Sequence, residues 1–464
     1  MAGENNGGAF EWLSGGLFFG SSNNSSDSSS RNSQGCIASI DSEKDVNSLL
    51  KGIQENLNGA IISSSVNHNS ADKISSTNVA ANNRGLSSSP PSQSVTLAAR
   101  LARLRFLLYD ERRVTSQQES PNRRGKPSVA IRTVESLEGA GTKSDLRDLI
   151  PILIRNLQLL PFESRKHVTA IFNYLLVCGF DGIDRDLYIP IMEKFRDYVA
   201  LNFDAIISPI VNVHVSSFAS SAGDSIEVNN NNRATTTTDV ILHCGSMYRS
   251  CFRHAKLYGQ LVVTTTRVER FVIPFIDRAL LPNFDVSSDA MENLKLVMTA
   301  GATCNDNNDS TAYIDTSSQQ ELAELAASFL TRDYEAVFDQ RFNPKLLSGE
   351  ANYMTKRIAL QILSTVLLTR SNYNTMIRYV NSRSNLILVM KLLRDNSPHI
   401  TLDAFHVFKV MVANPNKIPQ VEKILKDNSQ KLCTYLETLH YDKEASDQQF
   451  ADEKRLIITT IRGL

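Results

Sequence analysis

The sequence predicts an all-helical protein built from stacked helices. From Ser144 onward, apolar residues recur at helical spacing in one segment after another, with short connections and without the alternation that marks strands. Equivalent segments follow one another about every 40 to 50 residues, which is the period of armadillo or HEAT repeats. We therefore expect a right-handed α-solenoid of armadillo/HEAT-like repeats over residues 144–464, preceded by a largely disordered polar region over residues 1–143.

The composition excludes several classes of function. The 464 residues include 49 Lys and Arg against 49 Asp and Glu, so the chain lacks the basic surplus of a nucleic-acid-binding protein. A mean hydropathy of -0.21 and the lack of a long apolar segment predict no membrane insertion. Six scattered cysteines and the lack of a signal-peptide pattern predict reduced thiols in the cytosol or nucleus, and we expect a cytoplasmic protein.

The first 143 residues are mostly polar. Residues 20–35 and 62–94 are rich in Ser and Asn, and such segments bury too little apolar surface to offset the entropy lost on ordering. Two helical islands are expected within this region, at 45–57 and 95–109, because leucines recur there at helical spacing. Residues 114–140 are expected to form a polar loop.

The repeat region begins with a helix capped by Ser144 or Asp145. Pro151 either kinks this helix or marks its first turn, and Pro161 ends it. A second helix covers residues 168–176. Further helices are expected near 187–207, 239–263, 267–281, 288–300, 319–346, 350–369, 372–380, 384–394, 398–413, 418–439 and 446–462, with polar surface insertions at 217–238 and 302–318. Ser397 followed by Pro398 is a strong helix start, because the first helical position needs no N–H.

The segment HCGSMYRSCFRH carries four residues of types that bind zinc: His243, Cys244, Cys251 and His254. On one continuous helix, however, the two histidines would stand about 16 Å apart at 1.5 Å per residue, too far for one ion. We therefore interpret Cys244 and Cys251, seven residues apart, as small hydrophobic residues on the buried face of a helix.

No other motif indicates catalysis. The acidic loop with Asp181, Asp184 and Asp186 fails the calcium-loop pattern, because Asp186 stands where glycine is required and Met192 where glutamate is required. Phosphate-binding glycine loops, a kinase catalytic loop and a hydrolase nucleophile elbow are missing from the sequence. We expect no enzymatic activity, no metal and no cofactor.

The C-terminal third contains arginines and lysines at polar positions of successive helices. In a solenoid, equivalent positions of consecutive repeats line one concave surface. With Tyr353, Tyr373 and Met390 these basic residues have the composition of a protein-binding groove, although an ordinary charged exterior fits the pattern equally well. The basic residues concerned are Lys356, Arg357, Arg370, Arg378, Arg383 and Arg394.

Several segments resemble the calcium-binding protein 39 family, also called mouse protein twenty-five or the Hym-type scaffolds. The C-terminal segments that carry the resemblance are NYMTKRIALQIL (352–363), LLTRSNYNTM (367–376), NLILVMKLLRD (385–395), AFHVFKVMVANPNK (404–417) and QQFADEKRLIITTIRGL (448–464). Upstream, the same family is indicated by LIRNLQLLPFESRKHVTAIFNYLL (153–176) and HCGSMYRSCFRHAKL (243–257). The resemblance covers most of residues 144–464.

The resemblance implies a curved, non-catalytic helical scaffold. Its members bind protein kinases or pseudokinases of the sterile-twenty (germinal-centre) class and hold them in an active arrangement, in signalling for cell polarity and morphogenesis. A C-terminal pocket accepts a Trp-Glu-Phe tail of the partner. By motif position, Tyr353, Arg357, Arg370 and Tyr373 correspond to residues that contact the kinase, and Met390 to part of the tail pocket.

Two positions depart from the family pattern. Tyr373 stands where phenylalanine is more common, which keeps the ring, and Asp427 aligns with a pocket lysine, while Lys426 lies one residue away. If Asp427 faces the pocket, it would repel an acidic tail. The alternative function is a generic armadillo-like protein-interaction adaptor without kinase activation.

Overall fold

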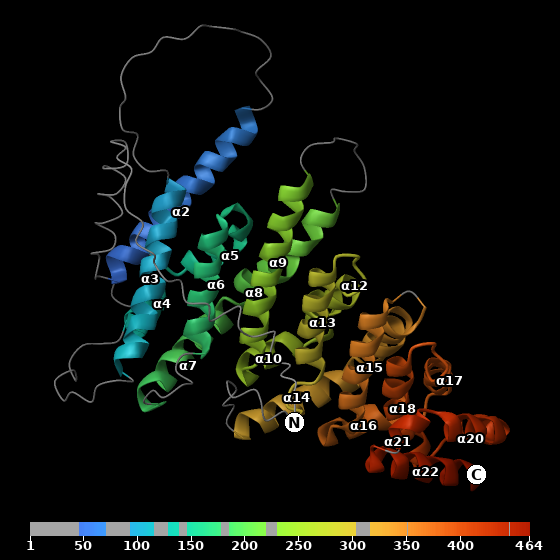
Figure 1. The fold of residues 1–464 in the computed structure, drawn as a ribbon. Coiled ribbons are helices and arrows are strands. Elements are labelled where there is room, and N and C mark those ends of the chain that lie inside the picture. The colour runs from blue at the N-terminus through green and yellow to red at the C-terminus, as the bar shows by residue number, and fades with distance from the viewer. Residues whose placement is uncertain are drawn as a thin grey trace, which may run out of the picture.

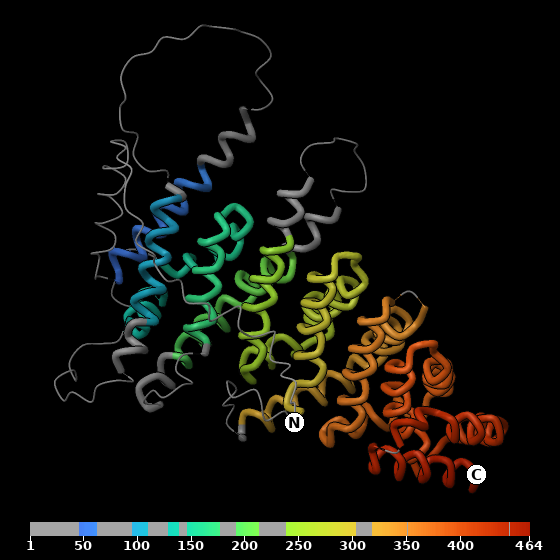
Figure 2. The backbone as a smooth tube through the Cα atoms, viewed as in Figure 1, coloured from blue at the N-terminus to red at the C-terminus, as the bar shows by residue number. Residues whose placement is uncertain are grey.

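The fold was obtained as a computed structural model, which describes residues 46–70, 93–115, 129–138, 146–177, 185–219, 230–302, 316–349, 351–444 and 446–464 (Figure 1). Every regular element within these ranges is a helix. Successive helices pack side by side along the length of the molecule, from the N-terminal α2 to the C-terminal α22 (Figure 1 and Figure 2). The structure therefore confirms the predicted helical repeat solenoid.

The longest row of helices runs through the whole solenoid, and we call it the first row. Each helix in it packs against the next one in the row. Its members are α3 (Gln93–Thr115), α6 (Phe162–Val177), α9 (Asn230–Phe252), α13 (Phe284–Met298), α15 (Tyr353–Leu368), α18 (Pro398–Ala413) and α22 (Gln448–Arg462).

Two further rows complete the stack. The second row consists of α4 (Val129–Glu138), α7 (Arg185–Leu201), α10 (Ala255–Val262), α14 (Thr316–Arg332) and α16 (Tyr373–Val380). The third row consists of α5 (Leu149–Arg155), α8 (Phe203–Ala219), α11 (Thr265–Phe271), α12 (Ile273–Arg278), the π-helix η5 (Glu335–Leu347), α17 (Arg383–Leu392) and α19 (Pro419–Asp427). Repeats of two or three helices are the arrangement of armadillo and HEAT solenoids; here the second row ends at α16, so the last repeats lack its helix.

Short elements complete the chain. The 3-10 turns are η4 (Leu157–Leu159) and η6 (Arg370–Asn372), and the C-terminal end also contains α20 (Ser429–Thr438) and α21 (Tyr441–Glu444), both packed against α22. Helix α2 (Val46–Ser70) packs against α3 and α4 at the N-terminal end.

The two helical islands predicted in the polar N-terminal region are present and longer than expected. They correspond to α2 and α3, whose leucines lie in the same hydrophobic core as the repeats. The prediction of a loop over residues 114–140 is wrong where the structure has α4, a short helix with Ala130, Val134 and Leu137 fully buried. Ten residues are too few to stand out as a helix in the sequence, and packing against α2 and α7 is what fixes α4. The domain boundary at residue 144 stays a prediction.

Several predicted boundaries also change. The segment 239–263 is not one helix, because α9 ends at Phe252 and α10 begins at Ala255. The insertion predicted at 217–238 is helical at both ends, since α8 extends to Ala219 and α9 starts at Asn230, and residues 220–229 lie outside the described residues. Once a helix is nucleated, each added residue gains a backbone hydrogen bond. Most of the insertion predicted at 302–318 lies outside the described residues. The helix predicted at 398–413 matches α18 residue for residue.

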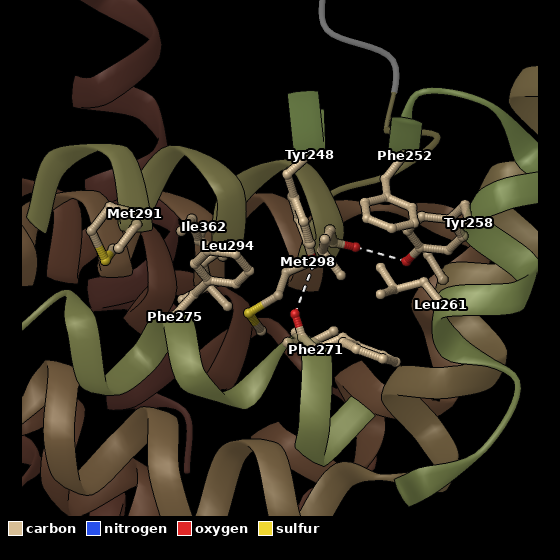
Figure 3. Close-up of a cluster of buried hydrophobic side chains, with 14 of the residues drawn as sticks. Tyr248, Phe252, Tyr258, Leu261, Phe271, Phe275, Met291, Leu294, Met298 and Ile362 are labelled. Atoms are coloured by element: carbon tan, nitrogen blue, oxygen red, sulfur yellow. Dashed lines mark hydrogen bonds between the residues drawn. The ribbon is translucent and has the colours of Figure 1, made fainter. Parts of the chain in front are cut away.

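The centre of the solenoid is an aromatic core shared by α9 to α13. Tyr248 and Tyr258 are fully buried, so each hydroxyl needs a partner. Tyr248 donates to the carbonyl of Phe271 at 3.0 Å, and Tyr258 donates to the carbonyl of Val297 at 2.7 Å (Figure 3). These bonds attach first-row α9 and second-row α10 to neighbouring helices, which fixes the relation between rows.

A buried ionic contact joins α9 to α13. Arg249 Nη1 lies 2.6 Å from the carboxylate of Asp289, whose side chain is only 4% exposed, and Asn293 donates to the same carboxylate at 2.9 Å. Gly245 makes this possible, because a Cβ at that position would lie 2.1 Å from Asp289 Oδ2. The glycine of the HCGSM segment thus serves helix packing.

Candidate protein-binding face

The first row presents a face of α15 to the exterior. Tyr353, Arg357, Gln361 and Leu368 follow one another at spacings of three to four residues or their sums, which places them on one side of the helix. The opposite side carries Ala359, Ile362 and Val366, which are buried in the core. Apolar residues are expected to be inside, yet Tyr353 is 40% and Leu368 60% exposed. This face is therefore available for contact with another molecule.

Arg357 is fixed in place by the next helix of the row. Its Nε lies 3.4 Å from Oδ2 of Asp403 on α18, and about a third of its side chain is exposed. Burial raises the pKa of Asp403, while the Arg357 charge lowers it. The pair bridges α15 and α18, and the Arg357 side chain remains partly exposed.

A second group of predicted residues lies at the far end of α15. Arg370 belongs to the turn η6, and Tyr373 is the first residue of α16, with 58% of its surface exposed. Arg370 is exposed and forms no ion pair with the residues that the structure describes. An exposed arginine next to an exposed tyrosine is the composition enriched in the centres of protein interfaces.

The five predicted residues do not form one compact site. Tyr353 and Arg357 lie at the start of α15, and the helix rises about 22 Å before Arg370 and Tyr373 are reached. Met390 lies elsewhere, on third-row α17, where it is half-buried against the core. The structure thus gives an elongated face with two ends, and Met390 as a separate element.

The sequence analysis missed part of the α15 face. Met354 is 40% exposed beside Tyr353, and Asp403 supplies the carboxylate that holds Arg357. The apolar members Tyr353, Met354, Leu368 and Tyr373 together give the face an unusual exposed apolar character. Met354 and Leu368 could have been recognised in the sequence, because these large apolar residues stand out of phase with the buried stripe of α15.

The candidate zinc ligands are not brought together. Cys244 and Cys251 are fully buried, and burial raises the pKa of the Cys244 thiol to about 12. His254 lies outside α9, directly before α10, and burial lowers its pKa to about 3. The prediction that the cysteines act as core residues is confirmed.

The described ranges contain no group of three or more His, Cys, Asp and Glu residues placed to hold a metal ion. The acidic loop at Asp181 and Asp184 falls outside these ranges. None of the described helices combines the length and the apolar character needed to cross a bilayer.

Comparison with known proteins places the chain among a group of helical scaffolds. A family model described as Mo25-like matches residues 101–307 and 318–464, which together make up most of the chain. The gap between the two matched segments falls within the insertion predicted at 302–318.

Similar individual proteins come from algae, animals and fungi. The degreening-related gene dee76 protein of Auxenochlorella protothecoides is 32% identical over 70% of this chain and 83% of its own length. The calcium-binding protein 39-like protein of Mus musculus is 31% identical over 68% of this chain and 76% of its own length. The conidiophore development protein hymA of Emericella nidulans is 42% identical over 30% of this chain and 36% of its own length.

Proposed function

This chain belongs to the Mo25-like family, and from that premise we propose that it is a non-catalytic scaffold that binds and allosterically activates protein kinases or pseudokinases of the sterile-twenty class. The observation that carries the proposal is the exposed face of α15 and α16, where Tyr353 and Tyr373 accompany Arg357 and Arg370. Cell polarity and morphogenesis are the processes we propose it serves, in the cytoplasm. A conidiophore development protein among its relatives supports that choice.

The chemistry of the face suits a folded partner. Arg370 is free to form two parallel hydrogen bonds with a carboxylate of a kinase helix, since a guanidinium presents its donors in a planar fork. Tyr353 and Tyr373 offer rigid aromatic surface at low entropic cost. The length of about 22 Å between the two ends of α15 allows one partner to be held at two points.

Activation needs no chemistry from the scaffold. A kinase domain exchanges between arrangements of its lobes, and a protein that binds the active arrangement more tightly increases the population of that arrangement. The gain is limited by the difference between the two affinities, about a tenfold shift for each 1.4 kcal/mol. Two points of contact on a rigid solenoid are well suited to select one lobe arrangement.

Met390 supplies the second proposed contact, a pocket for a Trp-Glu-Phe tail. Its half-buried thioether on α17 offers a soft surface for aromatic rings. Helix α17 packs against α19, which ends with the exposed Lys426 and Asp427. Lys426 would attract the tail glutamate and Asp427 would repel it, so the tail contact is expected to be the weaker of the two.

The test is an activity assay on purified sterile-twenty-type kinases of the source organism, with and without this protein. Wild type is expected to stimulate at least one kinase. Arg370→Ala should abolish stimulation and Met390→Ala should reduce it. Arg341→Ala is the matched control, because Arg341 is an exposed arginine on third-row η5.

Two results would reject kinase activation. One is no stimulation of any candidate kinase by the wild-type protein. The other is equal stimulation by wild type and Arg370→Ala. Binding of non-kinase partners, together with no affinity for Trp-Glu-Phe peptides, would support the generic adaptor instead.

A further inference from the structure

An open groove of 710 Å³ lies away from the α15–α16 face, where the second and third rows meet. One wall is the corner at which α7 passes into α8, and the other is formed by α10 and the start of α11. Helices α7 and α10 pack directly against each other (Figure 1). Its volume is in the range of sites that hold a small ligand or a few side chains of a peptide.

The rim of the groove carries exposed apolar side chains, and a glycine leaves room on its floor. Leu201 is 87% exposed on one wall and Val263 is 59% exposed on the other, so two aliphatic side chains face solvent at the mouth. Gly259 forms part of the floor and leaves room there, because a Cβ at that position would meet only Leu325, at 3.5 Å. Apolar side chains of a ligand would cover both rim residues.

The polar groups in the groove suit a peptide that carries a carboxylate. The charged lining residues are Lys256, Arg267 and Asp204; Arg267 pairs with Asp204 at 3.6 Å, and Lys256 pairs with Asp197 on α7. Exposed ion pairs of this kind contribute little, so a ligand carboxylate can take the place of Asp197 or Asp204. Arg267 stacks on the ring of Phe203 at 4.6 Å, which holds its guanidinium at the wall. The side-chain oxygen of Gln260 is buried and has no hydrogen-bond partner among the described residues. A buried acceptor of this kind calls for an N–H donor, which a peptide backbone supplies.

We infer that this groove binds the N-terminal segment of the same chain, residues 9–19 (AFEWLSGGLFF). Apart from Met1, every large apolar residue of the first 35 lies in this segment, and its single charge is that of Glu11. The segment precedes the described residues. It combines aromatic side chains for the rim with one carboxylate that can pair with Lys256 or Arg267, and its backbone provides the donor for Gln260.

The connection is long enough for this contact within one molecule. Residues 20–45 separate the segment from α2, and a Ser- and Asn-rich chain of that length has an average span of about 28 Å. From α2 the path crosses α4 and then α7, each in contact with the next. Two helix-to-helix steps of about 10 Å each lie within that span.

Trp12 makes the inference directly measurable, because it is the single tryptophan of the chain. In the full-length protein its fluorescence is expected to be blue-shifted, and less accessible to acrylamide, than in a synthetic peptide of residues 5–19. Leu201→Asp and Gly259→Leu should each return the emission to that of the peptide. Leu368→Asp, an exposed leucine on α15, is the matched control and should keep the blue shift.

Circular dichroism should show that each variant keeps its helical content. Because the two groove variants change different residues, a loss of the blue shift in both would not come from one local effect. Three results would overturn the inference. They are emission equal to that of the free peptide, a blue shift that survives both groove variants or is lost in Leu368→Asp, and a blue shift that grows with protein concentration. The last would mean that the segment binds a second copy.

Discussion

Gly245 provides a sharp test of how the solenoid is held together. In Gly245→Ala the new methyl group would lie 2.1 Å from Oδ2 and 2.3 Å from Oδ1 of Asp289, so the carboxylate must move. Moving it breaks the contacts of Asp289 with Arg249 and Asn293, both of which are 2.9 Å or shorter. The structure therefore predicts that the smallest possible side chain is destabilising here.

The magnitude follows from two opposing effects. Separating a buried ion pair costs about 3–5 kcal/mol, and the lower end applies because the Arg249 side chain is 27% exposed and regains water. Replacing glycine by alanine within a helix contributes about 1 kcal/mol in the stabilising direction. The expected net effect is a loss of about 2 kcal/mol in the free energy of unfolding.

Urea unfolding followed by circular dichroism measures this change, and a second glycine supplies the control. Gly259 also lies inside a helix, but its Cβ would make only an ordinary contact with Leu325. Gly259→Ala should therefore stabilise the protein by about 0.5–1 kcal/mol. The reasoning is refuted if Gly245→Ala stabilises the protein as Gly259→Ala does.

Three further predictions concern the C-terminal helices, the pH dependence and the tail contact. Lys454→Met should destabilise the protein by about 3 kcal/mol in urea unfolding, because the buried ammonium group is paired with Glu444, which would lose its partner. Lys431→Met, at an exposed position of α20, should be neutral. Burial lowers the pKa of His254 from 6.5 to about 3, so below pH 6.5 the unfolded chain binds a proton that the folded chain does not. The free energy of unfolding should therefore fall as the pH drops below 6.5, and it should fall less in His254→Asn. Urea midpoints measured between pH 7.5 and 5 test this. Asp427→Lys should strengthen binding of a Trp-Glu-Phe peptide about two- to fivefold in fluorescence anisotropy, and unchanged affinity would separate Asp427 from the tail pocket.

The architecture was accessible from the sequence because helical spacing repeats over most of the chain. Helix α18 is the clearest case, with Pro398 at the first position and Asn414 after the last helical residue. The helix boundaries around Phe252 and Ala255 were not accessible, since the apolar spacing continues across the break. Helix α4 was missed because its stability comes from packing against α2 and α7, which are distant in sequence.

The candidate face was predicted residue by residue but not in its geometry. Tyr353, Arg357, Arg370 and Tyr373 are exposed or partly exposed, as a contact surface requires. Sequence spacing did not show that α15 separates them into two ends. It also did not show that Asp403, 46 positions beyond Arg357, holds that arginine, because only the stacking of consecutive repeats joins α15 to α18.

Affinity purification with quantitative mass spectrometry tests the central claim most directly. Full-length wild type and Arg370→Ala are compared in extracts of the source organism, with Arg341→Ala as the control for losing an exposed arginine. Kinase scaffolding predicts that a sterile-twenty-type kinase or pseudokinase is enriched by wild type and Arg341→Ala and lost from Arg370→Ala. A wild-type sample without any such kinase, or equal enrichment by Arg370→Ala, would contradict it.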